Sequence, residues 1–86
     1  MIVEEMLVRN TFGFHLRPAT MFAAAAQGFS SDIKIGYNGR IVNGKSAIGL
    51  LKLEIKEREV ISIQIDGEDE TEAMRALIQL INREFI

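Results

Sequence analysis

The only histidine of this 86-residue chain, His15, is followed closely by Arg17 and by the only proline, Pro18. Proline is tolerated in the first turn of a helix but not in its interior, so Pro18 places a helix start beside His15. A helix N-terminus carries unpaired amides and a partial positive charge, which favour an anion such as phosphate. Imidazole is a neutral nucleophile near pH 7. The pattern predicts a phosphohistidine site with His15 as acceptor and Arg17 as its charge partner. The competing interpretation is a histidine that only caps or packs, although histidine is a poor helix cap.

The elements that must position this site form a β-α-β-β-α-β-α order. We expect strands at residues 2–8, 33–37, 40–43 and 61–66, with a polar turn of Arg9, Asn10 and Thr11 after the first. Apolar and polar residues alternate in the second and fourth strands, and Asn38-Gly39 is a strong hairpin signal. Apolar spacing predicts helices at 16–27, 47–53 and 70–83. This order indicates an α+β fold, a four-stranded and mostly antiparallel sheet with helices on one face and the other face wet.

Local signals mark the ends of these helices. Gly28 stands where a helix-terminating glycine is expected. Ser46 precedes an apolar run, as an N-cap does. Asp69 and Glu72 have the spacing of a capping box for the last helix.

Composition restricts the class of protein. The length fits one domain over residues 1–86, and a chain with no cysteine has neither disulfides nor a thiolate metal site. No apolar run is long enough to cross a membrane, so a cytoplasmic protein is expected. The net charge of −2, without a basic stripe, argues against nucleic-acid binding. Basic residues gather between 9 and 52 and acidic ones between 54 and 72. One end is therefore either basic enough to meet an acidic partner or an ordinary solvated face.

Two further patterns are interpreted as incidental. Residues 39–46 match the string of a nucleotide-binding P-loop, ending in Gly44-Lys45-Ser46. Gly39 is already used by the hairpin turn, however, and Ile41 and Val42 are expected in a strand, so the context of a phosphate loop is missing. The acidic run at 66–72 lacks the spacing and the glycine of a calcium loop, and no metal site is expected.

The segment Gly13-Phe14-His15-Leu16-Arg17-Pro18-Ala19 resembles the active-site signature of the HPr family, the histidine-containing phosphocarriers of the bacterial phosphoenolpyruvate-dependent phosphotransferase system. The likeness extends through Asn43-Gly44-Lys45-Ser46 to the whole chain. It implies an open-faced β-sandwich. It also implies a carrier that is not itself an enzyme and needs no cofactor, with phosphoenolpyruvate as the upstream donor.

The resemblance assigns roles to the residues of the motif. His15 would accept a phosphoryl group from phosphorylated enzyme I and pass it to the A component of a sugar-specific permease. Arg17 and the amides at the helix start would stabilise that group, which suits a reaction governed by positioning and electrostatics. Leu16, Pro18 and Thr20 would support the site. Pro18 would hold the helix start, and Thr20 would be a helper or, as we prefer, a helix-surface residue.

The resemblance also implies regulation and docking. The serine matching Ser46 is phosphorylated in many family members by a dedicated kinase/phosphorylase, as a signal read by a catabolite regulator. That role is compatible with an N-cap, since a phosphate at a helix start need not unfold it. Partners would dock on Ala47, Ile48 and Leu51, and the protein is expected to be a monomer.

The chain departs from the family at several positions. Leu16 replaces a residue that is usually alanine, and Ala24 and Gln27 stand where some members carry lysines for enzyme I. After Leu53 the family usually has glycine, with another a few residues on, whereas this chain has Glu54 and Arg58. We therefore expect the short helix to run longer or to end differently. The alternative function is that of a regulatory HPr-like paralogue, acting by protein binding in carbon or nitrogen signalling.

Overall fold

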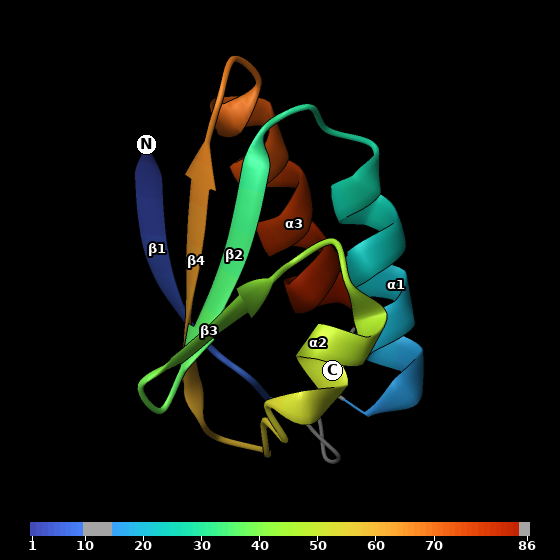
Figure 1. Cartoon of the computed structure of the whole chain (residues 1–86). Helices are drawn as coiled ribbons and strands as arrows, with labels where there is room; N and C mark the ends of the chain where they lie inside the picture. The colour runs from blue at the N-terminus through green and yellow to red at the C-terminus, as the bar shows by residue number, and fades with distance from the viewer. Residues whose placement is uncertain (10–14, 85–86) are drawn as a thin grey trace.

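The computed structural model describes residues 1–9 and 15–84, and its element order is the predicted one (Figure 1). Asn10 and Thr11 of the predicted turn, and Gly13 and Phe14 of the motif, lie outside the described residues. The strands are β1 (Ile2–Leu7), β2 (Asp32–Tyr37), β3 (Arg40–Asn43) and β4 (Val60–Asp66), and the helices are α1 (Leu16–Gln27), α2 (Ala47–Lys52) and α3 (Glu70–Glu84). The sheet order is β1-β4-β2-β3 with every pairing antiparallel, which confirms the α+β fold.

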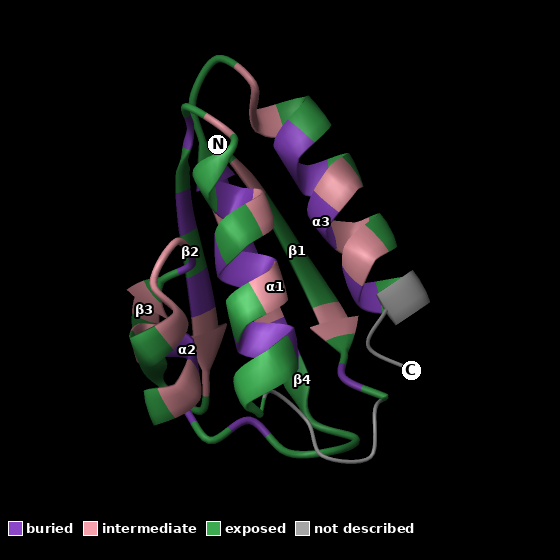
Figure 2. Cartoon of the chain, turned by 90° about the vertical axis from the view of Figure 1, so that its right-hand side faces the viewer, coloured by how far each residue is buried: buried purple, intermediate pink, exposed green. Residues whose placement is uncertain are grey.

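The sheet is covered by helices on one face only (Figures 1 and 2). Alternation decides which side chains meet them: Ile61, Ile63 and Ile65 of β4 are buried, as are Ile33 and Ile35 of β2. They pack with the apolar stripes of α1 and α3 in a single hydrophobic cluster. The opposite face is exposed to solvent, and the exposed Val3, Leu7, Ile41 and Val60 alternate with the buried strand positions and so lie on it. No helix in the described part of the chain is long and apolar enough to cross a bilayer.

Contacts across the chain hold α2 against α1. The Gln27 side-chain amide donates to the Lys45 carbonyl at 2.9 Å, and Lys45 Nζ donates to the Phe29 carbonyl at 2.7 Å, just beyond the end of α1. Gly44 allows this approach because a Cβ there would lie 2.7 Å from Ile33 Cγ2. At the other end of α2, Arg40 Nη2 donates to the carbonyl of Lys52. These contacts fix α2 beside the helix that starts at His15.

The predicted capping box of α3 is wrong. Asp69 does begin the helix, since its carbonyl accepts from the Ala73 amide at 2.9 Å. Its carboxylate, however, accepts from the amides of Ser30 and Ser31 at 2.8 and 3.0 Å, and from the Ser31 hydroxyl. A carboxylate held by the loop after α1 is not available to the Glu72 amide. Glu70 Oε1 instead accepts from the Gly67 amide at 3.1 Å.

Two other helix ends differ from expectation. Gly28 does end α1, but its φ of −74° is right-handed, so no left-handed glycine is needed there. Helix α2 ends at Lys52 and does not run longer. It ends because Glu54 adopts φ 55°, in the left-handed region that normally favours glycine. Arg58, further along the chain, lies in the same region with φ 69°. The two non-glycine residues keep a glycine-like path at the cost of backbone strain.

Candidate functional site

His15 occupies the N-cap position of α1. Its backbone is extended (φ −81°, ψ −171°), and its carbonyl accepts the first helical hydrogen bond from the Ala19 amide at 3.0 Å. The side chain is exposed and makes no capping hydrogen bond to the helix, as a serine or aspartate there would. The imidazole therefore stands at the helix start without closing it.

The backbone at this helix start keeps its donors. In the described chain nothing accepts a hydrogen bond from the amides of Leu16 and Arg17, and Pro18 in the same turn has no amide to donate. Pro18 is buried, which anchors the turn, and the first turn of α1 contains no acidic residue. Amides that point out of a helix start favour an anion. His15 thus lies beside two backbone amides that have no acceptor among the described residues.

Arg17 supplies the formal charge of this site. Its side chain is exposed, and no described residue forms an ion pair or hydrogen bond with it. A guanidinium can present several donors to phosphate oxygens at once. Arg17 is thus available to an anion beside His15.

Thr20 lies one turn along α1 from Leu16. Its hydroxyl donates to the Leu16 carbonyl at 2.7 Å, the preceding-turn bond that threonine often makes within helices. Because that proton is committed to the helix, the geometry favours a helix-surface role over direct help to a phosphate.

Ser46 is the N-cap of α2, as its sequence position predicts. Its Oγ accepts from the Gly49 amide at 3.0 Å, and its carbonyl accepts from the Leu50 amide at 3.1 Å. The residue is half-buried between β3 and α2. A larger anionic group on Oγ would meet the same helix start.

An apolar surface adjoins these two helix starts. Leu16 is 66% exposed and Ile48 is 68% exposed, while Ala47 and Leu51 are half-buried. Figure 2 shows α2 beside α1, with exposed residues on both helices. The predicted docking residues therefore lie on the helix that packs against the histidine-bearing helix.

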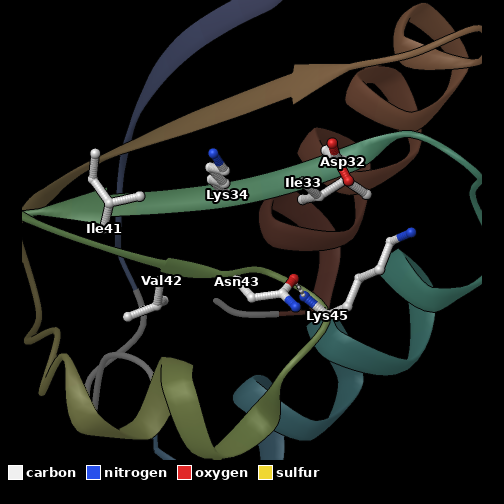
Figure 3. A pocket seen from close by; sticks show the side chains of 7 residues that line it. All are labelled: Asp32, Ile33, Lys34, Ile41, Val42, Asn43 and Lys45. Carbon is white, nitrogen blue, oxygen red and sulfur yellow. Dashed lines mark hydrogen bonds between the residues drawn. The ribbon is translucent and has the colours of Figure 1, made fainter.

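A cavity of about 450 Å³ lies elsewhere, where β2 and β3 diverge (Figure 3). Lys34, Asn43 and Lys45 line it, together with Asp32, Ile33, Ile41 and Val42. Lys45 extends from it toward the end of α1, where Nζ donates to Phe29. Residues 39–46 therefore do not form a phosphate loop, because Lys45 bonds to the chain at the end of α1 and Ile41 and Val42 lie in β3.

Sequence reasoning missed the long-range contacts that orient α2 and the start of α3. Lys45 and Phe29 are 16 residues apart, and Asp69 and Ser30 are 39 apart. No local pattern marks such pairs, because they depend on the folded path. Among the described residues no group of His, Asp and Glu side chains could hold a metal ion.

Comparisons with known proteins agree with this geometry. A family model, the phosphorylation site of the HPr component of the phosphotransferase system (PTS), matches residues 2–83. The chain is 40% identical over 85 residues to the phosphocarrier protein HPr of Neisseria meningitidis. The aligned region covers 99% of this chain and 96% of that protein. The crystal structure of HPr-C-His from Thermoanaerobacter tengcongensis superimposes with a TM-score of 0.94 at 35% identity, over 99% of this chain and 96% of the other. The catabolite repression containing protein Crh of Bacillus subtilis superimposes with a TM-score of 0.77 at 32% identity, over 100% and 99%.

Proposed function

The chain belongs to the HPr family, the phosphocarriers of the phosphotransferase system, and on that premise we propose that His15 is its phosphoacceptor. Phosphorylated enzyme I would be the donor, and the A component of a sugar permease would be the recipient. The observation that carries the proposal is the exposed His15 at a helix start where, among the described residues, the amides of Leu16 and Arg17 have no acceptor. The protein itself is a substrate of its partners and not an enzyme.

The transfer follows from the groups at this end of α1. A lone pair on a neutral ring nitrogen of His15 attacks phosphorus, and the bond between phosphorus and the donor breaks as the new P–N bond forms. The amides of Leu16 and Arg17 and the Arg17 guanidinium stabilise the charge on the phosphoryl oxygens. In the second transfer the permease component is the nucleophile that attacks phosphorus, and the P–N bond to His15 breaks. Pro18 keeps this turn in place.

Partner docking is proposed on Ala47, Ile48 and Leu51 of α2, the helix that packs against α1. Exposed aliphatic side chains that surround a reacting group provide contact area without competing for the phosphate. Residues 1–86 would act as a single domain and a monomer in the cytoplasm, where both partners are expected to meet it.

Ser46 is proposed as a regulatory phosphorylation site, acted on by a serine kinase/phosphorylase. A phosphate on Oγ would stay close to the Gly49 amide, so α2 would keep its start. Partners, including a catabolite regulator, would meet a new negative charge close in sequence to Ile48. The cap role and the regulatory role use the same atom.

The test is a two-step relay with purified components. Wild type, His15→Ala and the surface control Gln79→Ala are incubated with phosphoenolpyruvate and cognate enzyme I, and the A component is then added. We expect phosphate on wild type and on the control but not on His15→Ala. Wild type and the control should lose this phosphate once the A component is added. A folded wild type that never gains phosphate, while partners still bind His15→Ala, would support the regulatory paralogue instead.

A further inference from the structure

The face of the sheet turned away from the three helices carries exposed aliphatic side chains. Leu7 of β1 and Val60 of β4 lie directly opposite each other, and they are 42% and 52% exposed. Ile41 of β3 is 60% exposed on the same face. A solvated sheet face is ordinarily polar, and exposed apolar side chains that gather in one place mark interaction sites. The sheet thus has an apolar surface on the side away from α1 (Figure 1).

A hollow of about 310 Å³ lies between Val60 and Ile41 on this face. Gly36 of β2, which pairs with Ser62 on one side and Ile41 on the other, has no side chain to fill it. A Cβ at Gly36 would lie 2.5 Å from Ser62 Oγ. Glu5 of β1, opposite Ser62, adds a carboxylate to the lining. We call these five residues the outer hollow.

Glu5 is the charge that the outer hollow presents. It is exposed, and no residue in the described ranges forms an ion pair with it. Arg40 also lines the hollow, but its guanidinium donates to the Lys52 carbonyl of α2, on the helix-covered side of the sheet. The hollow therefore combines apolar walls with a carboxylate that lacks a cation.

The other charges of this sheet face offset one another. Lys34 and Asp32 lie further along β2 and together line a different pocket. Asp66 pairs with the amino group of Met1 at 3.4 Å. Arg9, beyond the end of β1, lines a pocket beside α3. A partner seated on the outer hollow would thus meet an uncompensated negative charge.

We propose that the outer hollow receives a lysine side chain from an aliphatic surface of a partner protein. The four-carbon stem of lysine packs against Val60 and Ile41, and its ammonium remains at the rim beside Glu5. Lysine fits better than arginine, because the hollow offers one carboxylate and one hydroxyl, whereas a guanidinium carries five donors in a fixed fork. His15 begins α1 in the helix layer, on the other side of the sheet, so such a partner leaves the histidine accessible (Figure 1).

The test uses a blocked tripeptide, acetyl-leucyl-lysyl-leucinamide, and its analogue with norleucine in place of lysine. Norleucine keeps the aliphatic stem and removes the charge. Amide NMR spectra of the labelled protein are recorded at peptide concentrations up to about 10 mM, a range that covers weak binding. The resonances of Gly36, Ile41 and Ser62 move with the lysine peptide, and those of Leu16 and Ile48 do not.

Glu5→Gln separates the charge from the apolar walls. Wild type binds the lysine peptide about threefold more tightly than the norleucine peptide, and Glu5→Gln binds the two equally. Glu4→Gln is the matched control and keeps the preference, because Glu4 is exposed on the same strand but pairs with the buried Ile63 and so faces the helix side. Ile41→Thr weakens both peptides by the same factor. In wild type the preference shrinks as KCl rises from about 0.05 M to about 0.5 M.

Three results would overturn the proposal. These are no movement of the outer-hollow resonances, movement centred instead on Leu16 and Ile48, or a lysine preference that survives Glu5→Gln. Thermal unfolding of each variant verifies its fold.

Phosphoryl transfer tests whether the outer hollow is separate from the histidine. Saturating lysine peptide leaves the phosphorylation of His15 by enzyme I unchanged, because the peptide lies on the other side of the sheet. Inhibition that Glu5→Gln relieves would contradict this separation. A His15 that is never phosphorylated contradicts the proposed function and leaves the lysine site standing.

Discussion

At the scale of single residues, the two helix starts differ in how they are capped. A serine or aspartate in place of His15 could accept from the first-turn amides of α1, whereas the imidazole makes no capping hydrogen bond, and among the described residues the amides of Leu16 and Arg17 have no acceptor. Ser46 does the opposite at the start of α2, where Oγ accepts from Gly49. A side chain thus caps the start of α2 but not the start of α1.

Ser46→Ala is expected to reduce the free energy of unfolding by about 1 kcal/mol, because the Gly49 amide loses its acceptor. Ser46→Asp is expected to retain most of the stability, since aspartate also caps and its charge suits the helix dipole. Urea titrations measure both, with the exposed Thr71→Ala as control. Equal stability of Ser46→Ala and wild type would show that the cap contributes nothing.

Asp69 gives a prediction about pH. Hydrogen bonds from the Ser31 hydroxyl and then from the Ser30 amide lower the pKa of the Asp69 carboxyl from 3.8 to about 2. A carboxyl whose pKa is lower in the folded state stabilises the fold above its unfolded pKa, and this contribution is lost as pH falls from about 4 to about 2. Melting temperatures of wild type and Asp69→Asn should therefore differ most at neutral pH and converge in acid. A difference that stays constant with pH would contradict the assignment.

At the scale of elements, the end of α2 is where strain is stored. Glu54 takes φ 55° one residue after the C-cap Leu53, a conformation that costs an ordinary residue roughly 1–2 kcal/mol. Glu54→Gly relieves it but gains disorder in the unfolded chain, so we expect a net stabilisation of about 0.5–1 kcal/mol.

Lys52→Gly is the matched control for Glu54→Gly. Lys52 lies within the helix, where glycine is expected to destabilise by about 0.5–1 kcal/mol. Chemical denaturation of the two variants should therefore move the midpoint in opposite directions. A Glu54→Gly variant that is less stable than wild type would mean that the glutamate side chain holds the turn.

The element boundaries were predictable because periodicity and turn residues are local signals. The hairpin at Asn38 and Gly39 and the helix start at Pro18 are examples. The hydrogen-bond partners of Asp69 were not predictable, because its carboxylate could accept from its own helix or from the distant Ser30 and Ser31, and it accepts from the latter. Of the two alternatives for α2, a longer helix was wrong, because a missing glycine does not reveal that a glutamate will adopt the backbone angle that ends the helix.

At the scale of the whole molecule, one core unites the sheet with its helices. Ile63 lies on β4, an inner strand, and is fully buried against that core. Ile63→Ala should lower the free energy of unfolding by about 2–5 kcal/mol, through lost burial and the cavity left behind. Unfolding followed by far-ultraviolet circular dichroism and by the single tyrosine, Tyr37 on β2, should coincide. Separate transitions would contradict a single cooperative core.

The order of elements, and with it the fold of the whole molecule, could be predicted from spacing and residue type. The roles of His15 and Arg17 remain predictions that the experiments above test. That α2 packs against α1 could not be read from either helix alone, because it depends on contacts between distant residues such as Gln27 and Lys45. The sequence left open whether its basic residues form one basic end, and α1 contributes only Arg17 to them.

The most direct measurement of the central claim is the intact mass of wild type and His15→Gln after incubation with phosphoenolpyruvate and enzyme I. Glutamine keeps the polarity and approximate size of the side chain but has no nucleophilic ring nitrogen. The account predicts a single added phosphate on wild type, lost in mild acid and stable in alkali, and none on the variant. An acid-stable phosphate, or equal phosphorylation of both proteins, would show that His15 is not the acceptor.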